Sequence, residues 1–139
     1  MKVFLDTNVF VYGLTRPESN SRKILELAES GKIEVVVSEL VQREVVRVFR
    51  RIADDEAAYN SLNYLRRIAH IIPRRKINRQ MIELRGKIKE KDLENIATTR
   101  QQKLKFLVSY DKDYAGFKEY VTPKEFAKIM GLKPVATEY

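Results

Sequence analysis

The sequence predicts an α/β domain built around a mainly parallel sheet. Strand-like and helix-like segments alternate along the chain, which is the pattern of crossover-connected parallel strands. The strand-like segments are short, apolar and rich in β-branched residues, as strands buried on both faces are. No internal repeat, low-complexity tract or Gly/Ser linker divides the 139 residues. We therefore expect a single domain over residues 1–139.

Cap residues and hydrophobic spacing predict the elements of the N-terminal part. Apolar residues recur at helical spacing after Ser38, which predicts a long helix capped by that serine. The predicted elements, in order, are a strand at Lys2–Leu5 ending at Asp6, a helix from Ser19 or Asn20 to Ser30, a strand at Ile33–Val37, and the helix after Ser38.

The same signals extend through the remaining chain. Thr122 followed by Pro123 is typical of the start of a helix. Before it we predict a helix capped by Asp54 or Asp55, a short strand ending at Pro73, helical stretches Arg79–Glu90 and Lys91–Gln102, a strand at Phe106–Ser109, a loop through Asp111, Asp113 and Gly116, and an edge strand at Tyr120–Val121. The tail after Gly131 is expected to be irregular.

The composition excludes several classes of protein. The chain has no cysteine, so disulfide frameworks, thiolate zinc sites and cysteine nucleophiles are excluded. The N-terminal residues do not have the pattern of a signal peptide, and no apolar run approaches the roughly 20 residues that cross a bilayer, so we expect a cytoplasmic protein without a membrane segment. A net charge of +8 favours a polyanionic partner, although a merely solvated basic surface would give the same number.

Acidic residues stand at positions that a parallel sheet brings together. Asp6 closes the first predicted strand, Glu44 lies on the helix after the second, Asp92 opens a helix, and Asp111 follows the fourth strand. Ligands of such sheets bind beyond the carboxyl ends of the strands, so these side chains can converge on one crevice.

Each acid also has a structural interpretation when it is taken alone. Asp6 could cap the following helix, and Glu44 could pair with Arg47 or Arg43 at an exposed helix edge. Asp92 could complement a helix dipole, and Asp111 could form a turn.

Taken together, converging carboxylates would require a cation. A like-charged pair about 4 Å apart costs roughly 4 kcal/mol at an effective dielectric of 20. Oxygen ligands favour Mg²⁺ or Mn²⁺, and the single histidine, His70, argues against a histidine-rich zinc site. An acidic metal pocket on a basic protein suits cleavage of phosphodiester bonds.

Four sequence blocks, in this order, resemble the PIN-domain family: VFLDTNVFV, VVVSELVQREV, KDLENIATTRQQKLKFLVSYDKDY and YVTPKEF. The resemblance covers essentially the whole chain and is greatest to small stand-alone prokaryotic proteins that include VapC-type toxins. It implies a three-layer α/β/α fold around a mostly parallel sheet. It also implies Mg²⁺- or Mn²⁺-dependent cleavage of RNA by the toxin of a toxin–antitoxin pair, with a homodimer and an antitoxin protein as expected partners.

By motif position, the resemblance implies catalytic and metal-binding roles for Asp6, Glu44, Asp92 and Asp111. Asn8, Ser109 and Asp113 match accessory polar positions. The sequence departs from the family pattern at two places, because Ser109 stands where threonine is common and Asn95 where histidine is frequent.

Other functions remain compatible with the sequence. The basic surface, which includes Arg47, Arg50 and Arg51, would equally serve an RNA-binding or assembly module without physiological cleavage. A DNA nuclease ranks lower because the short chain lacks obvious insertions for clamping a duplex.

Overall fold

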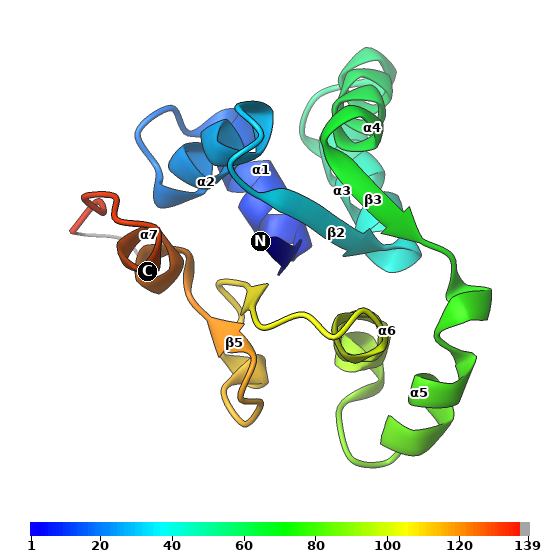
Figure 1. Ribbon diagram of the computed structural model, residues 1–139. Coiled ribbons are helices and arrows are strands. Elements are labelled where there is room, and N and C mark those ends of the chain that lie inside the picture. The colour runs from blue at the N-terminus through cyan, green and yellow to red at the C-terminus, as the bar shows by residue number, and fades with distance from the viewer. Residues whose placement is uncertain (137–139) are drawn as a thin grey trace.

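The computed structural model describes residues 1–136, and within them the strands form one parallel five-stranded sheet in the order β3-β2-β1-β4-β5 (Figure 1). The strands are β1 (Lys2–Leu5), β2 (Glu34–Ser38), β3 (Ala69–Ile72), β4 (Leu107–Val108) and β5 (Tyr120–Val121). Phe4 of β1 pairs with Val36 on one side and Leu107 on the other. The chain order therefore reverses at β1, where β2 and β4 flank the central strand.

Helices cover both faces of this sheet, which gives a three-layer α/β/α fold. The helices are α1 (Thr7–Thr15), α2 (Asn20–Glu29), α3 (Glu39–Ile52), α4 (Asp55–Ile68), α5 (Asn78–Leu84), α6 (Glu90–Gln101) and α7 (Pro123–Ile129), with 3-10 turns η1 (Arg74–Lys76) and η2 (Lys112–Tyr114). In Figure 1, α1, α2 and α7 lie on one side of the sheet and α5 and α6 on the other, while α3 and α4 pack together near β3. The predicted fold class is confirmed.

The core runs through the central strands and α6. Val3, Phe4 and Leu5 are completely buried, as expected for a strand covered on both faces. Eight consecutive residues of α6, from Asp92 to Thr99, are also buried. A surface helix normally buries only one face, whereas α6 is buried around its whole circumference over these residues. Its polar side chains therefore need hydrogen-bond partners inside the protein.

Predicted caps account for where most helices begin. Ser19, Ser38 and Asp54 each accept a hydrogen bond from a backbone amide in the first turn that follows. Thr122 forms a reciprocal capping box with Glu125. These local signals are strong because helix starts leave amides without intrahelical partners.

The predicted helix Arg79–Glu90 is wrong beyond Leu84. Helix α5 ends there, and Arg85 is extended and forms an isolated bridge to Ile88. Gly86 between them has a φ of 87°, a conformation that a glycine adopts at little cost and that no helix contains. The segment Arg85–Lys89 is therefore a loop leading into α6.

Smaller differences concern strand lengths and the tail. The strand predicted at Phe106–Ser109 is reduced to β4, and His70 lies exposed on β3. Residues 132–136 are irregular as expected, whereas the rest of the predicted tail, residues 137–139, lies outside the described residues. Within residues 1–136, none of the helices has both the length and the apolar character needed to cross a membrane.

Candidate active site

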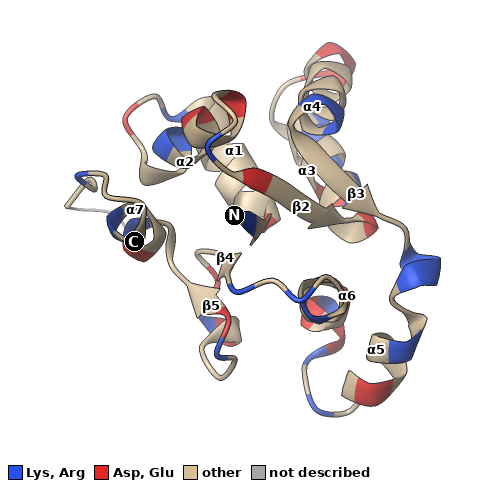
Figure 2. Ribbon diagram, in the orientation of Figure 1, with Lys and Arg blue, Asp and Glu red and all other residues tan. Residues whose placement is uncertain are grey.

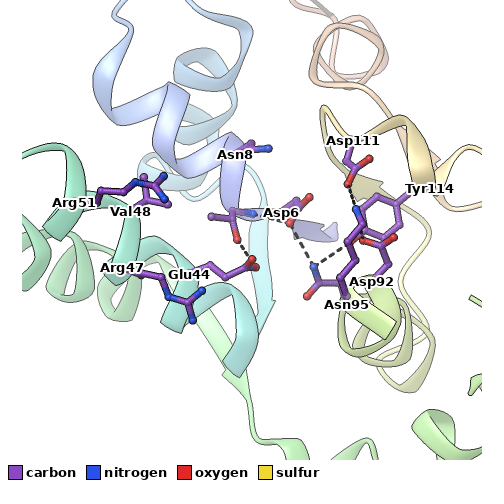
Figure 3. A pocket seen from close by; sticks show the side chains of 12 residues that line it. Asp6, Asn8, Glu44, Arg47, Val48, Arg51, Asp92, Asn95, Asp111 and Tyr114 are labelled. Carbon is purple, nitrogen blue, oxygen red and sulfur yellow. Dashed lines mark hydrogen bonds and ion pairs between the residues drawn. The ribbon is translucent and has the colours of Figure 1, made fainter. Parts of the chain in front are cut away.

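A pocket of about 300 Å³ opens beyond the carboxyl ends of β1 and β4. Its lining consists of Asp6, Thr7, Asn8, Glu44, Arg47, Val48, Arg51, Lys91, Asp92, Asn95, Asp111 and Tyr114. In Figure 3, Asp6 lies in the middle of the pocket, with Glu44 and Arg47 on one side and Asp92 and Asp111 on the other. The structure thus brings together the acids that the sequence places on four separate elements, at the point where the strand order reverses.

Asp6 is held at the bottom of the pocket by neutral hydrogen-bond donors. The Thr7 amide donates to Asp6 Oδ1 over 2.8 Å. Asp6 therefore caps α1, which is one of the roles that the sequence suggested for it. Asn95 Nδ2 donates to the same oxygen at 3.3 Å, and Ser109 Oγ donates to Oδ2 at 2.6 Å. Burial nevertheless raises the pKa of Asp6 to about 6, against the lowering effect of the Ser109 and Thr7 bonds, and the nearby charges of Glu44 and Asp111 raise the pKa further.

Glu44 faces the pocket because α3 is anchored to α6 at its first turn. Ser38 Oγ, which caps α3, also contacts Asn95 Oδ1 at 2.7 Å, and Glu94 Oε2 accepts a hydrogen bond from the Leu40 amide at 2.9 Å. This anchoring orients the next turn, where Glu44 Oε1 accepts a hydrogen bond from Thr7 Oγ1 at 3.0 Å.

The neighbouring arginine Arg43 lies 3.8 Å from Glu94 rather than pairing with Glu44. Its partner is thus a carboxylate of α6. The side chain of Glu44 is then left directed toward Thr7 and the pocket.

The opposite side of the pocket contains a second group of carboxylates. Ser109 Oγ accepts a hydrogen bond from the Asp111 amide, and Asp111 Oδ1 accepts one from the Asp113 amide, so the loop after β4 turns both aspartates toward α6. Carboxylate oxygens of Asp92, Asp111 and Asp113 lie within 4.8 Å of one another. Asp92 is buried, and this burial raises its pKa, whereas hydrogen bonds from Lys91 and Lys89 lower the pKa of the exposed Asp113.

Lys91 extends over this second group of carboxylates. Its Nζ lies 2.9 Å from Asp113 Oδ2, 3.1 Å from Asp111 Oδ2 and 3.6 Å from Asp92 Oδ1. The other oxygen of Asp92, Oδ2, is buried and has no hydrogen-bond partner within residues 1–136. Lys89 also pairs with Asp113, at 3.1 Å, so two ammonium groups face three carboxylates and balance only part of the negative charge at this side.

These residues fit a divalent metal ion by several independent measures. The available ligands are carboxylate oxygens, which hard cations such as Mg²⁺ and Mn²⁺ prefer. Asp92 Oδ2 has no hydrogen-bond partner within residues 1–136, and burial raises the pKa of Asp6, so a cation would stabilise the charged form of both side chains.

The family model for the PIN domain matches residues 2–113. The chain belongs to the PIN-domain family. The matched segment contains every element that contributes a side chain to the pocket except the end of η2. Comparison of the sequence with curated proteins gives no match.

Solved structures share the fold of this PIN domain at low sequence identity. VapBC2 from Rickettsia felis bound to a promoter DNA fragment has a TM-score of 0.70 and 19% identity, covering 88% of this chain and 98% of that one. A toxin–antitoxin complex from Klebsiella pneumoniae has a TM-score of 0.67 and 22% identity, covering 87% and 97%. The Mycobacterium tuberculosis VapC20, a sarcin–ricin loop cleaving toxin, has a TM-score of 0.60 and 15% identity, covering 82% and 93%.

The three accessory residues of the PIN domain, Asn8, Ser109 and Asp113, lie in different surroundings. Asn8 is exposed and lines the pocket, while Ser109 lies fully buried and bonds to Asp6. Asp113 is exposed and is not part of the lining, and its contacts are the ion pairs with Lys89 and Lys91. Asn95, which stands where histidine is frequent, donates to both Asp6 Oδ1 and the Tyr114 hydroxyl, so it joins α6 to β1 and to η2.

Sequence reasoning missed three residues of the site. In the sequence, Lys91 indicates only the start of a helix, and Thr7 and Tyr114 lie within family-like blocks without a predicted role of their own. Tyr114 is almost completely buried beside the pocket, and burial raises the pKa of its hydroxyl well above the usual value. The available signal in the sequence was the position of Tyr114, directly after Asp113 and three residues after Asp111.

Proposed function

We propose that this protein is a metal-dependent endoribonuclease and the toxin of a toxin–antitoxin pair. The observation that carries the proposal is the convergence of Asp6, Glu44, Asp92 and Asp111 on one pocket. Clustered, partly buried carboxylates destabilise a protein unless a cation balances their charge, so their presence indicates a metal-binding function. Membership of the PIN-domain family also supports nuclease chemistry.

Asp6, Glu44, Asp92 and Asp111 would hold Mg²⁺ or Mn²⁺. When bound, such an ion activates a water molecule and stabilises the leaving oxygen of the phosphodiester. The chain itself supplies the positioning. Thr7, Ser109 and Asn95 restrict the Asp6 and Glu44 carboxylates through neutral hydrogen bonds, which fix their direction without removing their charge.

The RNA backbone would approach across α3. Arg47 and Arg51 line the pocket and are exposed, whereas Arg50 of the same helix is paired with Asp55. A second hollow of about 490 Å³ between α3 and α4 shares Arg47 with the pocket and also includes Arg43 and Arg50. This row of guanidinium groups suits phosphates on either side of the cleaved bond.

Further basic residues extend the electropositive surface away from the pocket. Figure 2 shows the η1 turn, Arg74–Lys76, as a continuous basic segment beside α5. Together with the net charge of +8, it supports a nucleic-acid substrate.

The toxin role rests on the similar structures. Two of them are complexes of toxin and antitoxin proteins, and VapC20 is described as cleaving the sarcin–ricin loop. These complexes support an antitoxin partner for this chain. The proposal also includes a homodimer and a cytoplasmic location.

Cleavage of RNA by the purified protein, free of any antitoxin, tests the proposal. We expect cleavage with Mn²⁺ and none with EDTA. Asp6→Asn removes one ligand charge at constant volume, and because a metal ion stabilises the transition state by several kcal/mol, activity should fall about 100-fold or more. Asp54→Asn is the matched control, since Asp54 caps α4 away from the pocket and asparagine caps equally well.

The outcomes separate the candidate functions. If Asp6→Asn cleaved as fast as the unmodified protein while both had the same melting temperature, the proposed site would be wrong. If the protein bound RNA equally with Mn²⁺ and with EDTA but cut it in neither, it would be an RNA-binding module.

A further inference from the structure

The ammonium of Lys91 lies among three carboxylates that could hold a metal ion. Its Nζ contacts Asp113 at 2.9 Å, Asp111 at 3.1 Å and Asp92 at 3.6 Å. These are the same three residues whose carboxylate oxygens lie within 4.8 Å of one another. A divalent ion held by those oxygens would stand close to the ammonium, and two like charges at such a distance repel each other.

The ammonium is an incomplete substitute for a divalent ion. Lys89 and Lys91 together place two positive charges against three carboxylates, and of the two only Lys91 reaches Asp111 and Asp92. Asp92 Oδ2 has no hydrogen-bond partner within residues 1–136. A doubly charged ion with oxygen ligands would complete the coordination of these groups. The pairing of Lys91 is therefore one that a metal ion can outcompete.

Lys91 is also free to leave without a change in the fold. The residue is the second of α6, directly after the loop Arg85–Lys89, and its side chain is 56% exposed. The stem of a lysine rotates easily, and its ammonium is well hydrated in solvent. Displacement therefore requires only side-chain rotation.

We propose that Lys91 is a tethered counter-ion that divalent metal must displace, so that this residue sets the metal affinity of the site. The inference rests on the proposed function, because Asp92 and Asp111 are among the proposed metal ligands. The proposed nuclease would then remain metal-free, with its carboxylates neutralised in part, until the concentration of the ion exceeds a threshold determined by Lys91.

Direct measurement of Mn²⁺ binding by isothermal titration calorimetry tests this role. We expect Lys91→Met to lower the dissociation constant for Mn²⁺ about tenfold or more, because a repelling charge has been removed. Lys89→Met is the matched control. Lys89 pairs only with the exposed Asp113 among these three acids, so its removal should change the constant less than about threefold, as exposed pairs are weak.

Thermal unfolding gives a second readout independent of activity. In EDTA, Lys91→Met should melt at a lower temperature than the unmodified protein, because three carboxylates lose their shared cation. Excess Mn²⁺ should restore most of the difference, so the rise in melting temperature caused by Mn²⁺ is larger in this variant. Lys91→Arg keeps the charge and should bind Mn²⁺ with an affinity within about threefold of the unmodified protein, since a guanidinium repels the ion as an ammonium does.

Two outcomes would overturn the inference. If Lys91→Met bound Mn²⁺ with unchanged or weaker affinity while Asp111→Asn abolished binding, the metal site would stand and the role of Lys91 would fall. If neither the unmodified protein nor Lys91→Met bound Mn²⁺, the proposed metal site and the inference would both fail.

Discussion

The two sides of the pocket hold their acids in opposite ways. Asp6 and Glu44, on the side of β1 and α3, accept hydrogen bonds from neutral hydroxyl and amide groups. Asp111 and Asp113, on the side of α6 and η2, are paired with the ammonium of Lys91. Burial raises the pKa of Asp6 to about 6, whereas the lysine bonds lower the pKa of Asp113. Neutral donors fix a carboxylate in place but leave its charge unbalanced. A cation balances that charge and competes with any other cation for the same oxygens.

Asn95 connects the two sides. It donates to Asp6 Oδ1 at 3.3 Å and to the Tyr114 hydroxyl at 3.0 Å, and its own oxygen contacts Ser38 Oγ at 2.7 Å. All of these hydrogen bonds are buried, so this one amide joins the two sides of the pocket.

Replacement of Asn95 by leucine should have the largest effect on stability. The change removes the acceptor of the Ser38 hydroxyl and the donors to the Tyr114 hydroxyl and Asp6, and we expect a loss of about 4 kcal/mol in the free energy of unfolding. Urea denaturation in EDTA measures it. Asn60→Leu, at an exposed position of α4, is the control and should cost less than about 0.5 kcal/mol. A loss at Asn95 no larger than at Asn60 would show that the amide does not hold the two sides together.

The raised pKa of Asp6 predicts a particular dependence of stability on pH. The carboxyl has a pKa of about 6 in the folded protein, against an ordinary value of 3.8, so the folded state binds its proton more tightly. Its contribution is most favourable below pH 3.8 and is lost as the pH rises through 6. Between pH 4 and pH 8 in EDTA, the unmodified protein should lose roughly 2.5 kcal/mol relative to Asp6→Asn. Parallel pH profiles for the two proteins would show that Asp6 is not buried as a charge.

The hydroxyl of Thr7 offers the smallest test of the neutral side. Thr7→Val keeps the shape and removes the donor to Glu44, so the unfolding free energy should fall by about 1 kcal/mol. Because Glu44 loses its orientation, the affinity for Mn²⁺ should fall about tenfold. Thr15→Val, at the exposed end of α1, is the matched control. An affinity equal in both variants would show that Glu44 needs no positioning by Thr7.

Local signals predicted most of the fold because its elements are short and clearly capped. Ser38 illustrates this, since one hydroxyl predicted both the end of β2 and the start of α3. Gly86 illustrates a failure, because helical spacing of apolar residues does not reveal a positive φ that ends the helix early. The convergence of Asp6 with Asp111 followed from strand ends meeting at one edge of a parallel sheet.

Side-chain direction could not be predicted in the same way. Lys91 adjoins Asp92 in sequence, and neighbouring residues on a helix normally point apart. Its contact with Asp111 and Asp113 depends on the conformation of a loop twenty residues away, which no local pattern specifies. Asn95 is similar, since only the packed structure shows that its amide reaches both β1 and η2.

The strand order has a consequence for the protein during its synthesis. Because β1 lies between β2 and β4, the two sides of the pocket come from two separate segments of the polypeptide, residues 6–51 and 91–114. A chain still emerging from the ribosome can form β1, β2 and α3 but has no Asp111 to face them. The newly made protein therefore stays without a complete pocket until the segment through Tyr114 has been translated.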